Sequence, residues 1–420
     1  MVYVILCGKG RIGMSRIYPR EFYLRQLRPF YRTDLIKVIA GIRRCGKSCL
    51  MQSVADELVH GGVPQKDVIF INLDKRGFRK ITTADALDKA IGERITDGDY
   101  KYIFVDEVQN VDEFESVLNG FREDGNCSIF ITGSNSYLLS GELSTKLTGR
   151  YVQVDMFTLS FDEYLSMKKF MGYDMSDRTK EFNEYLTCGG FPKALEFQDE
   201  DAKRKYVGEV VGQIIDKDIR RRSKIKNRAI FEKVMTYLIN NFGSRVNLQS
   251  LENYFRSALH VAVKKDTLRR YIDILQTAKI LYKCPRFDMK SRKSLLGEGK
   301  FYLADTGIYF SRNVDGQINY GPVLENVVYT YLSCRGYKMS VGQIGSLECD
   351  FIARKGNDYF YIQVAMSIAD RDAEEREYRA LASAKDHYPQ YLFTLDTLLQ
   401  KRDGVRHVNI IDFITEGRDL

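Results

Sequence analysis

Eight consecutive residues, Gly41–Ser48, match the pattern G-x-x-x-x-G-K-[ST] without a gap. In this pattern the two glycines allow a tight backbone turn whose N–H groups point at phosphate oxygens. Lys47 is expected to reach the β and γ phosphates, and the hydroxyl of Ser48 to complete the shell of a Mg²⁺ ion. The spacing therefore predicts a nucleotide site with ATP and Mg²⁺ as its ligands. Its predicted contact residues are Gly41, Ile42, Arg43, Arg44, Cys45, Gly46, Lys47, Ser48 and Cys49.

The segments on either side of this loop have the order that a phosphate site needs. An apolar run at 36–40 predicts a strand, and the apolar spacing over 48–58 predicts a helix. A second glycine pattern, G-x-G-x-x-G at 8–13, lacks this context, because Pro19 interrupts the helix that should follow. We therefore expect no dinucleotide site there, and the first thirteen residues are interpreted as an upstream extension.

Polar residues follow two later apolar runs. The run at 101–105 ends in Asp106 and Glu107, which are predicted to hold Mg²⁺ and to polarise the attacking water, respectively. The run at 127–131 is followed by Thr132, Ser134 and Asn135, which either sense the γ phosphate and orient the water or cap a helix. With further strands at 68–73 and 151–154, five strands alternate with helices, which is typical of a parallel sheet flanked by helices.

Length and composition set limits on the remaining classes. The 420 residues exceed one core, and no run approaches the ~18 apolar residues of a membrane span, so a multidomain cytoplasmic protein is expected. Eight cysteines without a C-x-x-C pair and four scattered histidines argue against a zinc site or a disulfide framework. The net charge of +8 permits nucleic-acid binding without requiring it.

The middle of the chain predicts a winged helix. Helical spacing at 229–239, 247–255 and 264–276 precedes two short strands at 280–283 and 300–303. Its third helix and its wing are rich in basic residues, which suits either phosphate contacts on duplex DNA through 264–300 or a solvated face of a protein connector. These residues are Lys264, Lys265, Arg269, Arg270, Arg286, Lys290, Arg292, Lys293 and Lys300.

The C-terminal part predicts a helix at 322–332 and strands at 348–353 and 359–365, and this order resembles the restriction-endonuclease core, in which a helix Glu, a strand Asp and an E-x-K motif hold a metal ion. Glu325 and Asp350 stand at the first two positions. Gln363 and Ala365 stand where the acid and the lysine are needed, so we expect a degenerate core that serves recognition rather than cleavage. Glu348 points to the same face of its strand as Asp350 and is an alternative ligand, but we do not expect it to compensate for the missing acid.

As a set, five motifs resemble a prokaryotic family of AAA-superfamily ATPases that carry a winged-helix segment and a C-terminal domain of restriction-endonuclease-like fold. They are GIRRCGKS (41–48), IFVDEVQNV (103–111), FITGSNSYLLS (130–140), LTGRYVQVDMFTLSFDEYL (147–165) and CGGFPKAL (188–195). The resemblance implies that Gly41–Ser48 binds phosphates and that Asp106 and Glu107 are the metal-binding and water-activating acids. It also places Arg150 where the family has an arginine at the end of its sensor segment, acting in its own site or in a neighbour's.

We therefore predict an α/β fold, with a P-loop parallel sheet flanked by helices, followed by a winged-helix segment and an α/β restriction-endonuclease-like domain. The expected divisions are an N-terminal segment (1–29), the ATPase core (30–160), a helical lid (161–225), the winged helix (226–303) and the nuclease-like domain (304–420). The basic run from Arg220 to Arg228 supplies an arginine finger, a nucleic-acid contact or a solvated helix end. The expected function is a Mg²⁺-dependent ATPase that couples nucleotide state to the two later modules, with an ATP-dependent nuclease and an ATP-gated switch of low turnover as alternatives. The oligomeric state and the protein partner stay open.

Overall fold

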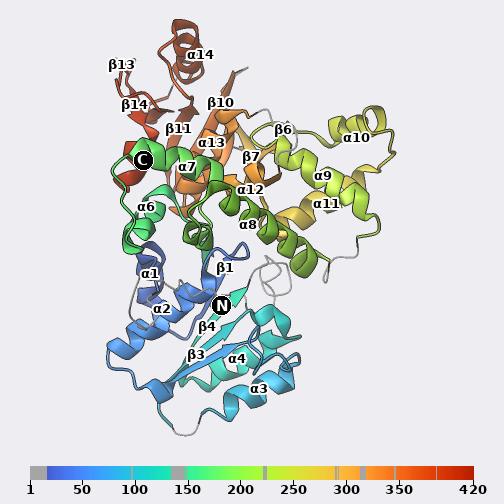
Figure 1. The fold of residues 1–420 in the computed structure, drawn as a ribbon, viewed down its shortest axis with the longest axis vertical. Coiled ribbons are helices and arrows are strands. Elements are labelled where there is room, and N and C mark those ends of the chain that lie inside the picture. The colour runs from blue at the N-terminus through green and yellow to red at the C-terminus, as the bar shows by residue number, and fades with distance from the viewer. Residues whose placement is uncertain are drawn as a thin grey trace. The chain divides into compact units, whose positions relative to one another are not determined.

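The computed structural model describes residues 17–95, 98–133, 147, 149–220, 225–288, 291, 293–312, 318–344, 347–384 and 386–420. The chain divides into two compact units (Figure 1). The first unit contains the described residues up to Met156 together with Thr277–Lys279, and the second contains Phe157–Gln276 and Ile280–Leu420. Within the described ranges, none of the helices combines the length and the apolar composition that a bilayer span requires.

The first unit is a five-stranded parallel sheet with the order β2-β3-β4-β1-β5. Its strands are β1 (Ile36–Gly41), β2 (Val68–Asn72), β3 (Lys101–Asp106), β4 (Cys127–Gly133) and β5 (Tyr151–Met156). Its helices are α1 (Glu21–Leu27), α2 (Lys47–His60), α3 (Ala84–Gly92) and α4 (Phe114–Asp124), with 3-10 turns at Arg28–Phe30, Gln65–Asp67 and Val108–Asn110. The predicted P-loop sheet flanked by helices is thus confirmed.

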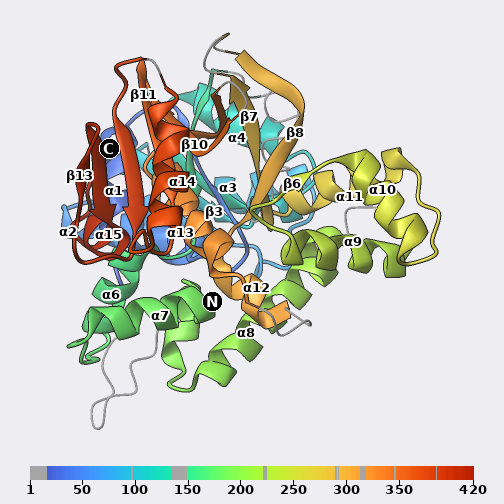
Figure 2. The same cartoon turned by 90° about the horizontal axis from the view of Figure 1, so that it is seen from above.

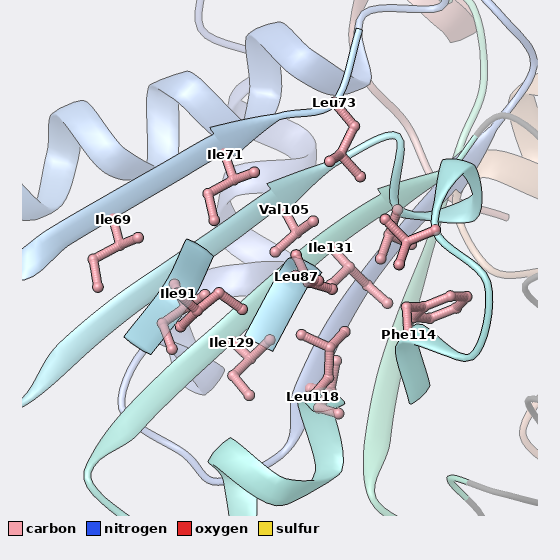
Figure 3. Close-up of a cluster of buried hydrophobic side chains, with 14 of the residues drawn as sticks. Ile69, Ile71, Leu73, Leu87, Ile91, Val105, Phe114, Leu118, Ile129 and Ile131 are labelled. Atoms are coloured by element: carbon pink, nitrogen blue, oxygen red, sulfur yellow. The ribbon is translucent and has the colours of Figure 1, made fainter. Parts of the chain in front are cut away.

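Apolar side chains on one face of this sheet pack against α3 and α4 (Figure 3). Alternate positions of the strands supply this layer, as the period of two in a strand requires. The residues labelled in the close-up are Ile69, Ile71, Leu73, Leu87, Ile91, Val105, Phe114, Leu118, Ile129 and Ile131. Because the layer is continuous across β2, β3 and β4, it fixes the register of the strands whose ends form the predicted site.

A ladder of rings crosses three of the strands in the same register. Phe70 stacks on Phe104 and Phe104 on Phe130, with ring centroids 5.6 and 4.7 Å apart. The ammonium of Lys37 on β1 lies 4.7 Å from the Phe130 ring and donates to Ser128 Oγ at 2.6 Å. Burial lowers the pKa of Lys37 to about 7.

The helix α1 belongs to this unit, since it packs against α2 and β5. The buried Arg20, which precedes α1, donates from Nη1 to the carbonyl of Cys45 at 3.1 Å. The segment before residue 30 therefore supports the phosphate loop. The predicted division at 29–30 does not separate compact units.

The second unit contains a nine-stranded sheet with the order β13-β14-β12-β11-β10-β9-β7-β8-β6 (Figure 2). Its strands are β6 (Arg245–Val246), β7 (Leu281–Asp288), β8 (Lys293–Leu303), β9 (Lys338–Ile344), β10 (Leu347–Lys355), β11 (Asp358–Val364), β12 (Gln390–Thr394), β13 (Lys401–Arg402) and β14 (Val405–Asn409). Strand β7 pairs antiparallel with β8 and parallel with β9. The division predicted at 303–304 therefore falls inside one sheet.

Helices surround this sheet. They are α6 (Phe161–Phe170), α7 (Arg178–Cys188), α8 (Glu200–Gln213), α9 (Arg228–Asn240), α10 (Leu248–Ser257), α11 (Lys265–Thr277), α12 (Thr306–Arg312), α13 (Tyr320–Cys334), α14 (Arg371–Ala382) and α15 (Ile410–Thr415), with a 3-10 turn at Pro192–Glu196 and a π-helical turn at Ile214–Ile219. The helices α9, α10 and α11 lie together beside β6 (Figures 1 and 2). Elements thus form where the sequence predicts three helices and a hairpin, and the strands extend through most of the expected polar loop.

The CGGFP motif is held by a buried carboxylate within the second unit. Asp305 accepts from Gly190 N at 2.8 Å through Oδ2 and from Gly307 N at 2.9 Å through Oδ1. A Cβ at Gly189 would lie 1.8 Å from Oδ1 of Asp305, and one at Gly190 would lie 2.2 Å from Leu159 O. Gly189 is therefore required by the close approach of the Asp305 carboxylate and by its φ of 77°, and Gly190 by close backbone packing.

Burial raises the pKa of Asp305 to about 6, although the Thr158 side chain and the two backbone hydrogen bonds act in the opposite direction. Between about pH 4 and pH 6 the folded chain keeps a proton that the unfolded chain releases. The protonated carboxyl therefore stabilises the folded chain at pH 4, and this contribution to the free energy of unfolding is lost as the pH rises through 6.

Asp305→Asn should remove this pH dependence. Between pH 4 and pH 6, the free energy of unfolding of the wild type should then fall relative to that of the variant by up to ~3 kcal/mol.

Urea unfolding followed by circular dichroism at pH 4, 5, 6 and 7 measures this difference. The exposed Asp174, changed to Asn, is the matched control and should keep the slope of the wild type. Equal slopes for the wild type and Asp305→Asn would contradict the prediction.

Candidate functional site

The carboxyl ends of the five parallel strands bring the predicted loop and acids to one edge of the sheet. The loop that follows β1 enters α2 through Gly46, whose φ of 107° lies in the left-handed region. Arg44 in the same loop also has a positive φ, of 68°. Backbone of this kind turns successive N–H groups toward one point, which suits an anion.

Glycine is needed at the two pattern positions for different reasons. A Cβ at Gly41 would lie 2.2 Å from the carbonyl oxygen of Met156, because β1 and β5 approach closely there. At Gly46 the requirement is the positive φ. The first glycine of the pattern, Gly41, is therefore needed for strand packing, and the second, Gly46, for the conformation of the loop.

Lys47 lies back on the loop. Its buried ammonium donates to the carbonyl oxygens of Gly41 at 3.0 Å and Ile42 at 3.1 Å. These acceptors are dipoles and carry no net charge, so a phosphate group would be a stronger partner. The lysine is thus placed at the mouth of the loop that the pattern assigns to phosphates.

Asp106 at the end of β3 accepts three hydrogen bonds. Its Oδ1 accepts from Ser48 Oγ at 3.1 Å and from Thr132 Oγ1 at 2.5 Å, and its Oδ2 accepts from Asn72 Nδ2 at 2.5 Å. Burial and the neighbouring Glu107 raise the pKa of Asp106, while the bonds from Thr132 and Ser48 oppose this shift. The carboxylate that is predicted to hold Mg²⁺ is therefore fixed in orientation by β2, β4 and α2.

Glu107 follows directly and has a left-handed backbone, with φ 59°. Its N–H donates to Thr132 Oγ1 at 3.0 Å, and its carboxylate accepts from Gln109 Nε2. Thr132 thus contacts both acids at once. The structure brings Ser48, Asp106, Glu107 and Thr132 together, whereas Ser134 and Asn135 lie outside the described residues.

Asn72 is a site residue that the sequence analysis missed. It lies in register with Asp106, and its Oδ1 accepts from the backbone N–H groups of Asp74 and Lys75, both at 3.1 Å. Its position in the sequence could have predicted this role, because it is a polar residue at the carboxyl end of a strand in the same parallel sheet.

Arg150 lies away from this edge. It precedes β5, so the six residues of that strand, about 20 Å of extended chain, separate it from the end where the loop lies. Its guanidinium donates to Asn119 Oδ1 at 3.0 Å and lies 3.5 Å from Glu123 Oε1, both on α4. The structure therefore does not bring Arg150 together with the loop and the acids, and a contact between Arg150 and nucleotide stays a prediction.

The described ends of the basic run pair with acids of their own region. Arg220 pairs with Asp216 and lies 3.5 Å from Glu232 Oε1, and Arg228 donates to the same oxygen at 3.0 Å. This arrangement favours the solvated helix end among the three interpretations. Residues 221–224 lie outside the described residues.

Two of the basic residues predicted to face DNA are engaged elsewhere. Lys300 is 6% exposed and lies among carboxylates, and Arg286 donates to Gln343 Oε1. Lys264, Lys265, Arg269 and Arg270 are exposed, as expected. Lys290 and Arg292 lie outside the described residues, as does the side chain of Lys293. Among the described residues, the basic surface predicted to contact DNA therefore consists of the residues on and next to α11.

The C-terminal carboxylates do converge, but around a lysine. Glu325 on α13 and Glu348 and Asp350 on β10 surround the ammonium of Lys300 on β8. Burial and then Glu325 raise the pKa of Asp350 to about 8. Gln363, at the position of the missing acid, accepts from Asp350 N at 3.2 Å and donates to Glu377 Oε2 at 2.7 Å.

Comparison with known families agrees with the phosphate loop of the first unit. Residues 33–165 match the family described as AAA domain, and residues 179–315 match a family described as a domain of unknown function. The second match crosses the divisions predicted at 225–226 and 303–304. Among solved structures, Cdc6p from Pyrobaculum aerophilum aligns over 66% of this chain and 90% of its own, with a TM-score of 0.32 and 13% identity.

Two relatives align over most of their length. An uncharacterized protein of Methanocaldococcus jannaschii is 27% identical over 83% of this chain and 78% of its own. An uncharacterized protein of Haemophilus influenzae is 34% identical over 94% of this chain and 98% of its own. The chain therefore belongs to one family with the Haemophilus influenzae protein, and its residues 33–165 match the AAA domain.

Proposed function

We propose that the protein is a Mg²⁺-dependent ATPase. The observation that carries this proposal is the bond of 3.1 Å between Ser48 Oγ and Asp106 Oδ1, which joins the start of α2 to the end of β3. It places a hydroxyl and a carboxylate, both suitable for Mg²⁺, beside a loop suited to phosphates. Bound there, the ion would neutralise charge on the β and γ phosphates.

The side chains around this point have separate tasks in the proposed reaction. Lys47 exchanges the carbonyls of Gly41 and Ile42 for phosphate oxygens. Glu107 accepts the proton of the attacking water. Gln109 donates to the carboxylate of Glu107, and Thr132 accepts from the backbone N–H of Glu107, so both hold the acid in place. Asn135 is proposed to orient the same water.

Lys47→Ala should lower the affinity for ATP by about 100-fold or more, because it removes a charge-assisted contact to the phosphates. The fold should be retained. Binding of a fluorescent ATP analogue, titrated with Mg²⁺ present, measures the affinity, and circular dichroism checks the fold. Lys89→Ala, on the exposed face of α3, is the control and should bind like the wild type. Unchanged ATP affinity in Lys47→Ala would refute the assignment of the loop.

We also propose that Arg150 acts on nucleotide bound by a neighbouring copy of the chain. Its position at the amino-terminal edge of the sheet and its side-chain exposure of 42% support this proposal. The planar guanidinium suits the charge that develops on phosphate oxygens in the transition state. Release from Asn119 and Glu123 would be needed for that contact.

A mixing experiment tests this proposal. Lys47→Ala and Arg150→Ala should each lose ATP turnover, and an equal mixture after subunit exchange should regain about a quarter of the wild-type rate. The reason is that random assembly pairs an intact loop with an intact arginine at about one interface in four. Full activity of Arg150→Ala alone, or a mixture that stays inactive after exchange, would contradict the proposal.

A third part of the proposal concerns the second unit. We propose that α11 contacts the phosphates of duplex DNA, so that the predicted winged helix couples DNA to nucleotide state. One side of α11 is buried through Leu268, Tyr271 and Leu275. Lys265 and Arg269 are four positions apart on the exposed side, where they share one face.

The double variant Lys265→Ala/Arg269→Ala should weaken binding of a labelled duplex and reduce the slope of log K against log salt by about two, since each phosphate contact contributes ~0.9. Fluorescence anisotropy across a KCl series measures both quantities. Arg371→Ala/Arg379→Ala removes the same charge from exposed positions of α14 and should leave the slope unchanged. An equal effect of the two double variants would favour a nonspecific charge effect and overturn the role of α11.

A further inference from the structure

Three carboxylates of the second unit, those of Glu325, Glu348 and Asp350, surround the ammonium of Lys300. The Nζ of Lys300 lies 3.1 Å from Glu325 Oε2, 3.3 Å from Glu348 Oε1 and 3.6 Å from Asp350 Oδ1. The ammonium has three N–H donors and faces three carboxylates. Burial lowers the pKa of Lys300, but Glu325, Asp350 and Glu348 together raise it above its usual value, so the lysine stays charged.

The surrounding bonds fix this arrangement. Tyr302 donates from its hydroxyl to Glu325 Oε2 at 2.6 Å, and Arg245 on β6 pairs with Glu348. The second oxygen of Asp350 accepts from Val364 N at 2.9 Å. The carboxylates are thus satisfied by partners from β6, β8 and β11, all of them within the second unit.

A divalent ion does not fit the residues that are present. Mg²⁺ and Ca²⁺ bind oxygen at about 2.0–2.6 Å, and the position that the three carboxylates share is already filled by the Lys300 ammonium, which lies 3.1–3.6 Å from their oxygens. Gln363 supplies a neutral amide that is bonded to Asp350 and Glu377, and Ala365 supplies no ligand. Among the residues that the structure describes, no group of three or more acidic, histidine or cysteine side chains is arranged to hold a metal ion.

We propose that Lys300 is a built-in cation that takes the place of the nuclease metal. The cluster of Lys300, Glu325, Glu348 and Asp350 is then a network of ion pairs. It connects the β7–β8 hairpin to α13 and β10. In this arrangement the C-terminal segment needs no divalent ion and does not cleave DNA. This inference does not depend on ATP hydrolysis in the first unit.

Titration of the full-length wild type with Mn²⁺ in the absence of nucleotide tests the proposal directly. Electron paramagnetic resonance counts bound Mn²⁺, and Asp350→Asn is compared with the wild type so that any ion at the phosphate loop cancels. We expect the same number of bound ions in both proteins and intact plasmid after incubation with either. One additional Mn²⁺ in the wild type, or plasmid cleavage that Asp350→Asn removes, would overturn the proposal.

Removal of the lysine gives the complementary result. Lys300→Ala should lower the unfolding midpoint and make it rise with Mn²⁺, and this rise should disappear in Lys300→Ala/Asp350→Asn. Lys300→Arg keeps the charge and should show no rise with Mn²⁺. A folded Lys300→Ala variant whose stability does not respond to Mn²⁺ would show that the lysine does not occupy the place of an ion. If Lys300→Ala does not fold, the comparison of the wild type with Asp350→Asn decides the question alone.

Discussion

The buried carboxylate of Asp106 is the point on which the first unit depends. It accepts from Asn72 on β2, Ser48 on α2 and Thr132 on β4. A carboxylate that is 1% exposed requires such partners, since an unbonded buried charge is strongly destabilising. The same three bonds set the angle at which the acid faces the phosphate loop. Fold stability and the geometry of the site therefore rest on the same side chains.

Much of this site follows from the sequence because its signals are local. A mainly apolar run of four to six residues predicts each strand, and in a parallel sheet every strand end reaches the same edge. The glycine pattern then places the loop, and Asp106 and Glu107 follow their strand directly. No long-range information is needed to place these residues at one edge.

Asn72, Arg150 and Lys300 depend on contacts that no local pattern encodes. Asn72 becomes a partner of Asp106 because β2 is the neighbour of β3, which is a matter of strand order. Arg150 precedes its strand, and the parallel direction of β5 therefore puts it at the edge opposite the loop. Lys300 is predicted to lie on a basic surface because it belongs to the lysine- and arginine-rich wing. It is buried because β7 pairs with β9, which brings the hairpin into the C-terminal sheet.

Three buried lysines show how the partners of an ammonium decide what it does. Lys37 has a hydroxyl, a carbonyl and a ring as partners, and burial lowers its pKa to about 7. Lys300 faces three carboxylates and keeps its charge, so a further anion would gain little from it. Lys47 donates to two carbonyl oxygens, which orient the ammonium but carry no net charge, and its charge acts on the carboxylate of Asp106. Of these three lysines, Lys47 therefore gains the most favourable electrostatic interaction when a phosphate binds. This difference in partners distinguishes a ligand-binding lysine from a structural one.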